Sequence, residues 1–246
     1  MTTPVPPEVV GAPSDSALVS VLVPVYDEAG TIEELIRRVA ELPLRLEIVA
    51  VDDGSRDRTA EILRGLEQEL GTLRVLSHSV NRGKGAAMRT AIAASTGDIV
   101  VVQDADLEYD PRDVPRLIDP IVSGLADVVY GSRLRGGQPQ RAHLFWHYAG
   151  NRFLSLLTNV LYNTTISDME VGYKAFRGEL IRSVDLVSDD FGFEPEVTAK
   201  LLRRPGVRLF ELPIAYYGRT YAEGKKITWR DGVKAVGTLV RFRFSR

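Results

Sequence analysis

The chain has 246 residues, of which 44% are hydrophobic and 26% charged, which is enough material for one large core in a single α/β domain. Its 31 basic and 33 acidic residues leave a formal charge of -2, so no overall charge attracts nucleic acid, and we expect no nucleic acid partner. The lack of cysteine excludes disulfides, thiolate nucleophiles and cysteine-ligated metals, so oxygen ligands must hold any metal.

The first seventeen residues are rich in Pro, Ser and Ala and have neither the basic start nor the apolar run of a secretory signal, which predicts a flexible leader over 1–17. Nowhere do about eighteen apolar residues run together without a charge, so the sequence predicts no helix that spans a bilayer. We expect a cytoplasmic protein whose contact with a membrane, if it has one, is peripheral and at the inner face.

From residue 18 to about 130, short β-branched runs alternate with amphipathic stretches, which is the pattern of a parallel sheet with crossover helices. Strands are predicted over 19–25, 47–52, 74–77, 99–103 and 127–130. Helices are predicted over 31–41, 57–70, 85–95 and 111–123. Ligands of an open parallel sheet bind beyond the carboxyl ends of its strands. The acids expected at that edge are Asp27, Asp52, Asp53, Asp104 and Asp106.

After residue 133 this alternation stops. The later sequence predicts a helix over 143–162, a loop over 167–177, a helix over 194–203 and a strand over 207–216. A basic amphipathic helix over 231–246 is expected to close the chain. No repeat or linker indicates a second domain, so we expect one domain over 18–230.

The strongest local pattern is Val-Val-Val-Gln-Asp104-Ala105-Asp106-Leu-Glu108, a buried strand followed by alternate carboxylates. Residues two apart on an extended chain face the same side, so these acids are expected to converge on one cation. Oxygen ligands suit Mg²⁺ or Mn²⁺, which can bridge the phosphates of a nucleoside diphosphate. A solvated turn is the alternative, because a lone Asp-x-Asp is common.

Two other strands end in similar motifs. The run Asp52-Asp53-Gly-Ser follows the second strand, where a carboxylate can accept hydrogen bonds from a base or a ribose, or can form an N-capping turn. The run Pro24-Val-Tyr26-Asp-Glu28 ends the first strand, where an aromatic ring and an acid could flank a nucleoside.

A fourth motif, Asn-Arg82-Gly-Lys84-Gly, precedes an alanine-rich helix. Its glycines permit close backbone approach, and Arg82 or Lys84 could meet a phosphate. The spacing and the missing Ser/Thr distinguish it from a Walker loop, which disfavours a kinase or NTPase. A plain loop that opens the helix is the alternative.

These four motifs and Gly-Ser-Arg133, taken in order, resemble family 2 glycosyltransferases of the GT-A fold. More narrowly, the sequence is similar to polyprenyl-phosphate sugar synthases such as dolichyl-phosphate mannose synthase. The resemblance covers about residues 18–230. It implies one Rossmann-like α/β domain with a mostly parallel mixed sheet flanked by helices. Its nucleotide-sugar half would cover about 18–133 and its acceptor half about 134–230.

The activity that the resemblance implies is metal-dependent, inverting transfer of a hexose to a polyprenyl phosphate. The donor would be of the GDP-mannose or UDP-glucose type. The nucleotide-sugar contacts implied are Pro24, Tyr26, Glu28, Asp52, Asp53, Arg82, Lys84, Asp104 and Ala105. The metal ligands implied are Asp104, Asp106 and Glu108. Glu108 departs from the Gln or Ser that is frequent at this position in the family.

On the acceptor side, Arg133 and Arg152 match family arginines that hold the acceptor phosphate, for which a guanidinium fork is well shaped. The alternative for Arg152 is an exposed helix arginine. Asp168 matches an acid near the transferred sugar, where it would position hydroxyls or act as a base for a hydroxyl acceptor. Arg219 and Lys225 resemble a basic loop that closes on the diphosphate, although Gly stands where the family has Ser before the lysine. The catalytic set implied is Asp106, Asp168, Arg219 and Lys225.

A polyprenyl phosphate is already an anion at neutral pH, because phosphate monoesters have a second pKa near 6, so its attack needs no general base. His143 and His147, four apart on a predicted helix, could ligate a metal, but a helix that packs against lipid or the sheet is the favoured interpretation. The C-terminal helix could contact a bilayer surface or a membrane partner subunit. Two alternatives remain, a family 2 enzyme with a soluble hydroxyl acceptor and a non-catalytic nucleotide-sugar-binding subunit.

Overall fold

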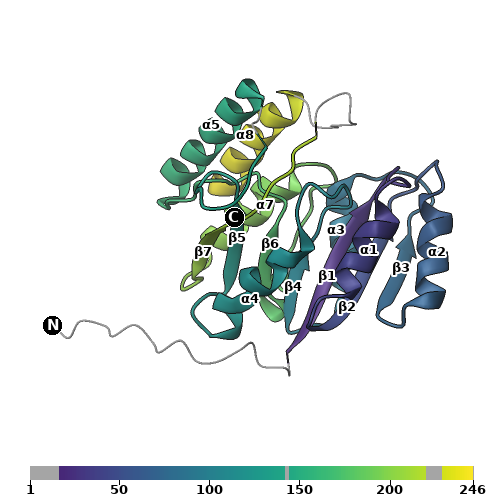
Figure 1. Ribbon diagram of the computed structural model, residues 1–246. Coiled ribbons are helices and arrows are strands. Elements are labelled where there is room, and N and C mark those ends of the chain that lie inside the picture. The colour runs from purple at the N-terminus through teal and green to yellow at the C-terminus, as the bar shows by residue number, and fades with distance from the viewer. Residues whose placement is uncertain (1–16, 142–143, 220–228, 246) are drawn as a thin grey trace.

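The computed structural model describes residues 17–141, 144–219 and 229–245 (Figure 1). The predicted leader, apart from Ala17, therefore lies outside the described residues, and so do His143 and Lys225. None of the described helices is both long and apolar enough to cross a bilayer.

The predicted parallel sheet is present, with the strand order β3-β2-β1-β4-β6-β5-β7 in the described residues. Neighbouring strands pair in parallel, except that β6 is antiparallel to both β4 and β5. The strands are β1 Leu18–Val25, β2 Arg45–Asp52, β3 Leu73–Ser77, β4 Ile99–Val102, β5 Val128–Ser132, β6 Lys174–Arg177 and β7 Leu209–Pro213.

Helices connect and cover these strands. The helices are α1 Ile32–Ala40, α2 Thr59–Glu69, α3 Lys84–Ala94, the 3₁₀ turn η1 Pro111–Asp113, α4 Val114–Val122, α5 Phe145–Tyr162, α6 Gly178–Arg182, α7 Phe193–Leu202 and α8 Trp229–Phe244. Apolar periodicity explains why such helices form. In α1, for example, the buried residues recur at helical spacing. The central strand β4 is buried along its whole length, which explains its continuous apolar run.

One prediction about the sheet was wrong. The segment 167–177 was expected to be a loop, but β6 occupies its end and separates β4 from β5. The sequence hides this strand because it is short and begins with a lysine, a residue that is rarely buried. Lys174 is nonetheless fully buried, and Ala175 pairs with Val101 of β4. The last strand is also shorter than predicted, 209–213 in place of 207–216.

The chain leaves β1 toward β2 on one side and returns to β4 on the other. Such a change of direction opens a crevice at the carboxyl ends of the two adjacent strands. Figure 1 shows α5 and α8 side by side at this end of the molecule. A small apolar cluster of Leu154, Met169, Ala235 and Leu239 joins these two helices. The fold therefore places the acidic strand ends next to a helical pair from the second half.

Candidate active site

A cavity of about 810 Å³ lies over the crevice between β1 and β4. One end is lined by residues that follow the strands, among them Tyr26, Asp104 and Asp106. The other end is lined by α5 and α8, through residues such as Phe153 and Val236. The cavity thus connects a polar, acidic region to a largely apolar one.

The Asp-x-Asp segment forms a turn and not the extended chain that the sequence predicted. Strand β4 ends at Val102, and Leu107 has a left-handed backbone with φ 59°. The alternation of a strand therefore does not carry on to Glu108. Asp104, Asp106 and Glu108 all line the cavity. Their proximity follows from the turn and not from strand geometry.

Asp106 is surrounded by like charges. Burial raises the pKa of Asp106 to about 7, and repulsion from Asp104 and Glu108 contributes to the shift. A divalent cation would relieve this repulsion, so the oxygen set fits Mg²⁺ or Mn²⁺. Within the described ranges, however, no group of three or more acidic or histidine side chains is already arranged to hold an ion. The proposed metal ligands remain a prediction.

Other contacts explain why these carboxylates are not arranged around one point. Asp104 is paired with Lys84, whose Nζ lies 2.7 Å from Oδ1. Glu108 accepts a hydrogen bond from the Tyr216 hydroxyl at 2.6 Å and another from the backbone N–H of Arg219 at 2.5 Å. Glu108 therefore anchors the segment before residue 220 to the Asp-x-Asp turn.

The carboxylates after β2 organise the neighbouring loops. Asp52 is buried, accepts a hydrogen bond from the Ser55 N–H at 3.1 Å, and is absent from the cavity lining. Asp53 lines the cavity and accepts from the N–H groups of Arg82 and Gly83 and from Nδ1 of His78. Both carboxylates thus hold loop backbone, although neither provides the side-chain cap of α2 or α3, and the nucleoside contact of Asp52 remains a prediction.

The glycines of the Asn-Arg-Gly-Lys-Gly motif allow close packing within the chain. A Cβ on Gly83 would lie 2.2 Å from the carbonyl oxygen of Asp189, and one on Gly85 would lie 2.3 Å from that of Ser188. Arg82 is exposed and does not line the cavity, whereas Lys84 does. Lys84 also binds Glu194 at 2.8 Å. The motif therefore joins the first half of the chain to the segment before α7.

Arg219 joins the segment that follows β1 to the Asp-x-Asp turn. Its guanidinium donates to the Glu28 carboxylate at 3.0 Å and to the carbonyl of Asp106 at 2.6 Å.

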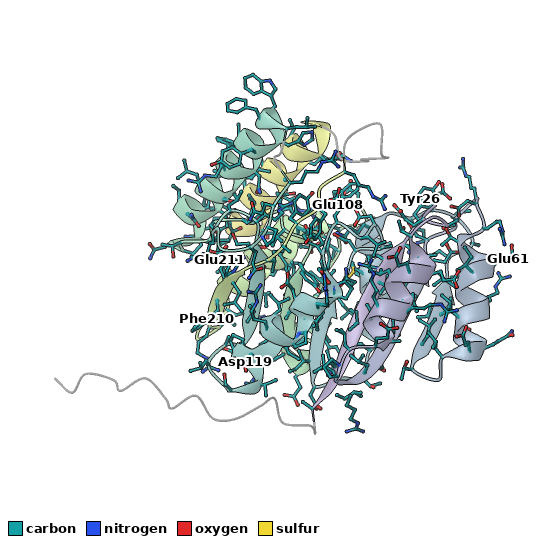
Figure 2. The ribbon with its side chains drawn as sticks, viewed as in Figure 1. Tyr26, Glu61, Glu108, Asp119, Phe210 and Glu211 are labelled. Atoms are coloured by element: carbon teal, nitrogen blue, oxygen red, sulfur yellow. The ribbon has the colours of Figure 1, made fainter. Side chains whose placement is uncertain are left out.

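The end of β1 and the residues just after it also line the cavity, through Pro24, Val25, Tyr26 and Glu28. Figure 2 shows Tyr26 and Glu108 at the same edge of the molecule, whereas Asp119 lies toward the opposite edge. Ala105 also lines the cavity.

Arg133 and Asp168 form a buried pair. Nε and Nη2 of Arg133 donate to the two carboxylate oxygens at 2.8 and 2.7 Å, and its backbone N–H donates at 2.9 Å. Asn151 donates to the same carboxylate at 2.7 Å. Burial would raise the pKa of Asp168, but Arg133 outweighs it, so the pKa lies below its usual value. Arg133 lines the cavity and Asp168 does not.

Several residues that sequence reasoning did not assign also belong to this site. Glu194, Asn151 and Glu170 line the cavity. The sequence places Glu194 only at the start of a predicted helix and indicates no role for the other two side chains. Burial raises the pKa of Glu170 to about 7, aided by repulsion from Glu194. Burial lowers the pKa of Lys174 to about 8.

One of the two predicted acceptor arginines lies away from the cavity lining. Arg152 is exposed on α5 and does not line the cavity. His147 does line it. Lys225, expected to neutralise the leaving diphosphate, falls outside the described residues, so its role remains a prediction.

This mixed sheet, with a cavity over the carboxyl ends of β1 and β4, is a GT-A fold, as the sequence predicted. A solved structure with a similar fold is glucosyl-3-phosphoglycerate synthase from Mycobacterium tuberculosis, in complex with Mn²⁺, UDP and phosphoglyceric acid. The match has a TM-score of 0.73 and 23% identity, and covers 94% of this chain and 80% of that one.

The chain belongs to glycosyl transferase family 2, whose family model matches residues 20–184. It is 31% identical over 214 residues to undecaprenyl-phosphate 4-deoxy-4-formamido-L-arabinose transferase of Pseudomonas aeruginosa, covering 85% of this chain and 60% of the relative. It is 30% identical over 211 residues to dolichol-phosphate mannosyltransferase of Pyrococcus furiosus, covering 84% and 58%. The chain thus spans about three fifths of the length of these relatives. The resemblance seen in the sequence motifs is confirmed.

Proposed function

We propose that this protein transfers a hexose, with inversion, from a nucleoside diphosphate sugar to a polyprenyl phosphate. The observation that carries the proposal is the single cavity that joins the carboxylates after β1 and β4 to an apolar region between α5 and α8. A charged donor and a lipid acceptor need these two environments side by side. The relatives named above, which act on undecaprenyl phosphate and dolichol phosphate by name, support it.

The donor would occupy the acidic end. Tyr26 and Glu28 would contact the nucleoside, and Asp104 and Asp106 would hold Mg²⁺ or Mn²⁺ against the diphosphate. The bound cation would neutralise charge on the departing diphosphate. Arg219, already fixed between Glu28 and the carbonyl of Asp106, would supply a second positive charge there.

The burial and the hydrogen bonds of Asp168 favour a phosphate acceptor over a hydroxyl acceptor. A general base needs an accessible oxygen and a pKa near neutrality. Asp168 is fully buried, its carboxylate is bound by Arg133 and Asn151, and its pKa is lowered. A phosphate monoester requires no base, because it is ionised at pH 7. Arg133 lines the cavity and would bind it through Nη1, because its hydrogen bonds to Asp168 use only its backbone N–H, Nε and Nη2.

Exposed apolar side chains on α5 and α8 support a lipid acceptor and peripheral membrane contact. On α5, Trp146, Phe153 and Val160 share one helical face and are 81%, 58% and 73% exposed. On α8, Val233 and Phe244 are 63% and 74% exposed. Such a surface suits insertion into the headgroup region of a bilayer. The acceptor phosphate would then reach the cavity from the bilayer surface.

A radiochemical assay tests this proposal. UDP-glucose and GDP-mannose, each labelled in the sugar, are incubated with the full chain, undecaprenyl or dolichyl phosphate, and Mn²⁺ or Mg²⁺. We expect label in the organic extract for one donor, and loss of that label with EDTA or Asp106→Ala. Label that stays in water with every lipid, but appears on a small hydroxyl compound, would replace the lipid by a soluble acceptor.

A further inference from the structure

We infer that Glu170 and Asn151 bind hydroxyl groups of the transferred sugar, and that this site accepts a neutral sugar and disfavours a uronic acid. The inference rests on the proposed function, because it names the sugar contacts of the same cavity. It depends on two buried oxygen atoms for which the described part of the chain offers no hydrogen-bond donor.

These two atoms are Oε1 of Glu170 and Oδ1 of Asn151. Both residues line the cavity. An acceptor that is buried without a donor costs about 1–3 kcal/mol, and more when it is charged. Two such atoms at one cavity therefore mark a place where a hydroxyl group, of a ligand or of water, can donate a hydrogen bond, since most buried polar groups in folded proteins are satisfied.

The orientation of Asn151 is fixed by its neighbour. Its Nδ2 donates to the Asp168 carboxylate at 2.7 Å. The reverse orientation would put the amide oxygen against a carboxylate oxygen, which is repulsive, so Oδ1 must point away from Asp168. Asp168 is in turn held by Arg133. The unsatisfied oxygen of Asn151 is thus held in place by a rigid buried pair.

Glu170 differs from the other buried acids of this region. Glu194 is paired with Lys84 at 2.8 Å, and Asp168 with Arg133 at 2.7 Å. The nearby cation Lys174 does not form an ion pair with Glu170 in the described part of the chain. Its ammonium group donates to the carbonyls of Met169 and Val171 and lies 4.5 Å from the centre of the Tyr130 ring.

The chemistry of the site selects the ligand class. Acceptor oxygens without donors suit hydroxyl groups, and every hexose carries several. A carboxylate on the sugar would meet Glu170 and Glu194, which already repel one another. A uronic acid should therefore bind worse than the neutral sugar with the same ring.

Binding measurements separate the sugar from the nucleotide. Dissociation constants are measured by calorimetry with Mn²⁺ for UDP, UDP-glucose, UDP-glucuronate, GDP and GDP-mannose. The variants are Glu170→Ala, Glu170→Gln, Asn151→Ala and the control Glu179→Ala, an exposed acid of α6. In Glu170→Ala, we expect the nucleotide sugar to bind about ten- to a hundredfold more weakly, with the affinity for the nucleoside diphosphate unchanged.

Further readouts distinguish a ligand contact from a structural role. Glu170→Gln removes a carboxyl whose anionic form is disfavoured by burial and by Glu194, so its melting temperature should equal or exceed that of the wild type, whereas loss of a structural acid would lower it. Monodeoxy analogues of the bound sugar should identify one hydroxyl whose removal weakens binding to the wild type but not to Glu170→Ala. Wild type should also bind UDP-glucuronate at least about tenfold more weakly than UDP-glucose.

The outcomes are distinct. If the wild type binds and transfers the sugar, and Glu170→Ala and Asn151→Ala keep the same ratio of sugar to nucleotide affinity, this inference is overturned while the proposed function stands. If the wild type binds neither UDP nor GDP with or without a sugar, both fail together.

Discussion

The two halves of this chain hold their functional charges in different ways. In the first half, Asp52 accepts from Ser55 and Asp53 accepts from Arg82 and Gly83, all of them backbone N–H groups of loops at the same sheet edge. In the second half, Arg133 binds a carboxylate 35 positions further along the chain. The first arrangement belongs to strand-end loops that a sequence motif can reveal, and the second depends on tertiary structure.

The largest expected effect comes from removing one member of the buried pair in the second half. Asp168→Ala leaves the Arg133 charge buried and uncompensated, which should lower the free energy of unfolding by about 3–5 kcal/mol. Asp119→Ala, an exposed aspartate of α4, should change it by less than about 0.5 kcal/mol. Urea denaturation at pH 7 measures both.

The same pair predicts a dependence on pH. Because Arg133 holds the pKa of Asp168 below its usual value, the pair stabilises the fold fully above the unfolded pKa of about 3.9. That contribution is lost as the pH falls through the folded pKa. The stability of Asp168→Ala should therefore fall less than that of the wild type as the pH is lowered from 5 through the folded pKa of this carboxyl. Parallel curves for variant and wild type would contradict the interpretation.

The corresponding change in the first half replaces Asp106, and we expect it to lower activity without lowering stability. Asp106→Asn removes a carboxylate whose pKa burial and two like charges raise to about 7. The loss of this carboxylate should leave the melting temperature equal or higher, because a buried charge disappears. Transfer should fall by about a hundred- to a thousandfold. A variant that melts earlier and keeps its activity would show that Asp106 is a structural acid.

A smaller effect is expected where the two halves touch. A Cβ on Gly172 would lie 2.2 Å from Oδ2 of Asp104, so Gly172→Ala must displace that carboxylate. We expect transfer to fall by about ten- to a hundredfold, since a shift near 1 Å has costs of that order. Gly65→Ala in α2 meets nothing within 4 Å and should leave activity unchanged. Equal rates for both variants would exclude a close fit at Gly172.

The contrast also shows how much could be read from the sequence. Strands β1 to β5 and the helices between them follow from apolar runs and periodicity, and the family from motifs at strand ends. Strand β6 was missed because it is four residues long and begins with the buried Lys174. Arg82 and Lys84 matched one motif equally well, yet only Lys84 lines the cavity.

Residues of the predicted acceptor side were harder to assign, because their positions depend on how helices pack in the folded chain. Arg152 was chosen by its place in a motif, but α5 directs it to solvent, while the adjacent Asn151 faces the cavity. On a helix, neighbouring residues point about 100° apart, so a motif alone does not indicate which of two adjacent side chains faces a cavity. Partners such as Glu194 for Lys84 depend on the docking of α7 beside α3, which no local pattern encodes.

The smallest predicted effect concerns the exposed aromatic side chains of α5. Replacing Trp146 and Phe153 by serine removes two exposed aromatic rings, and should weaken binding to vesicles of phosphatidylglycerol and phosphatidylcholine by about tenfold. Val80→Ser, which is 64% exposed in the first half, is the matched control and should have no effect. Vesicle sedimentation measures the binding. Equal loss from both variants would mean that any exposed apolar side chain contributes to vesicle binding, whereas loss from the α5 variant alone would assign membrane contact to the second half of the chain.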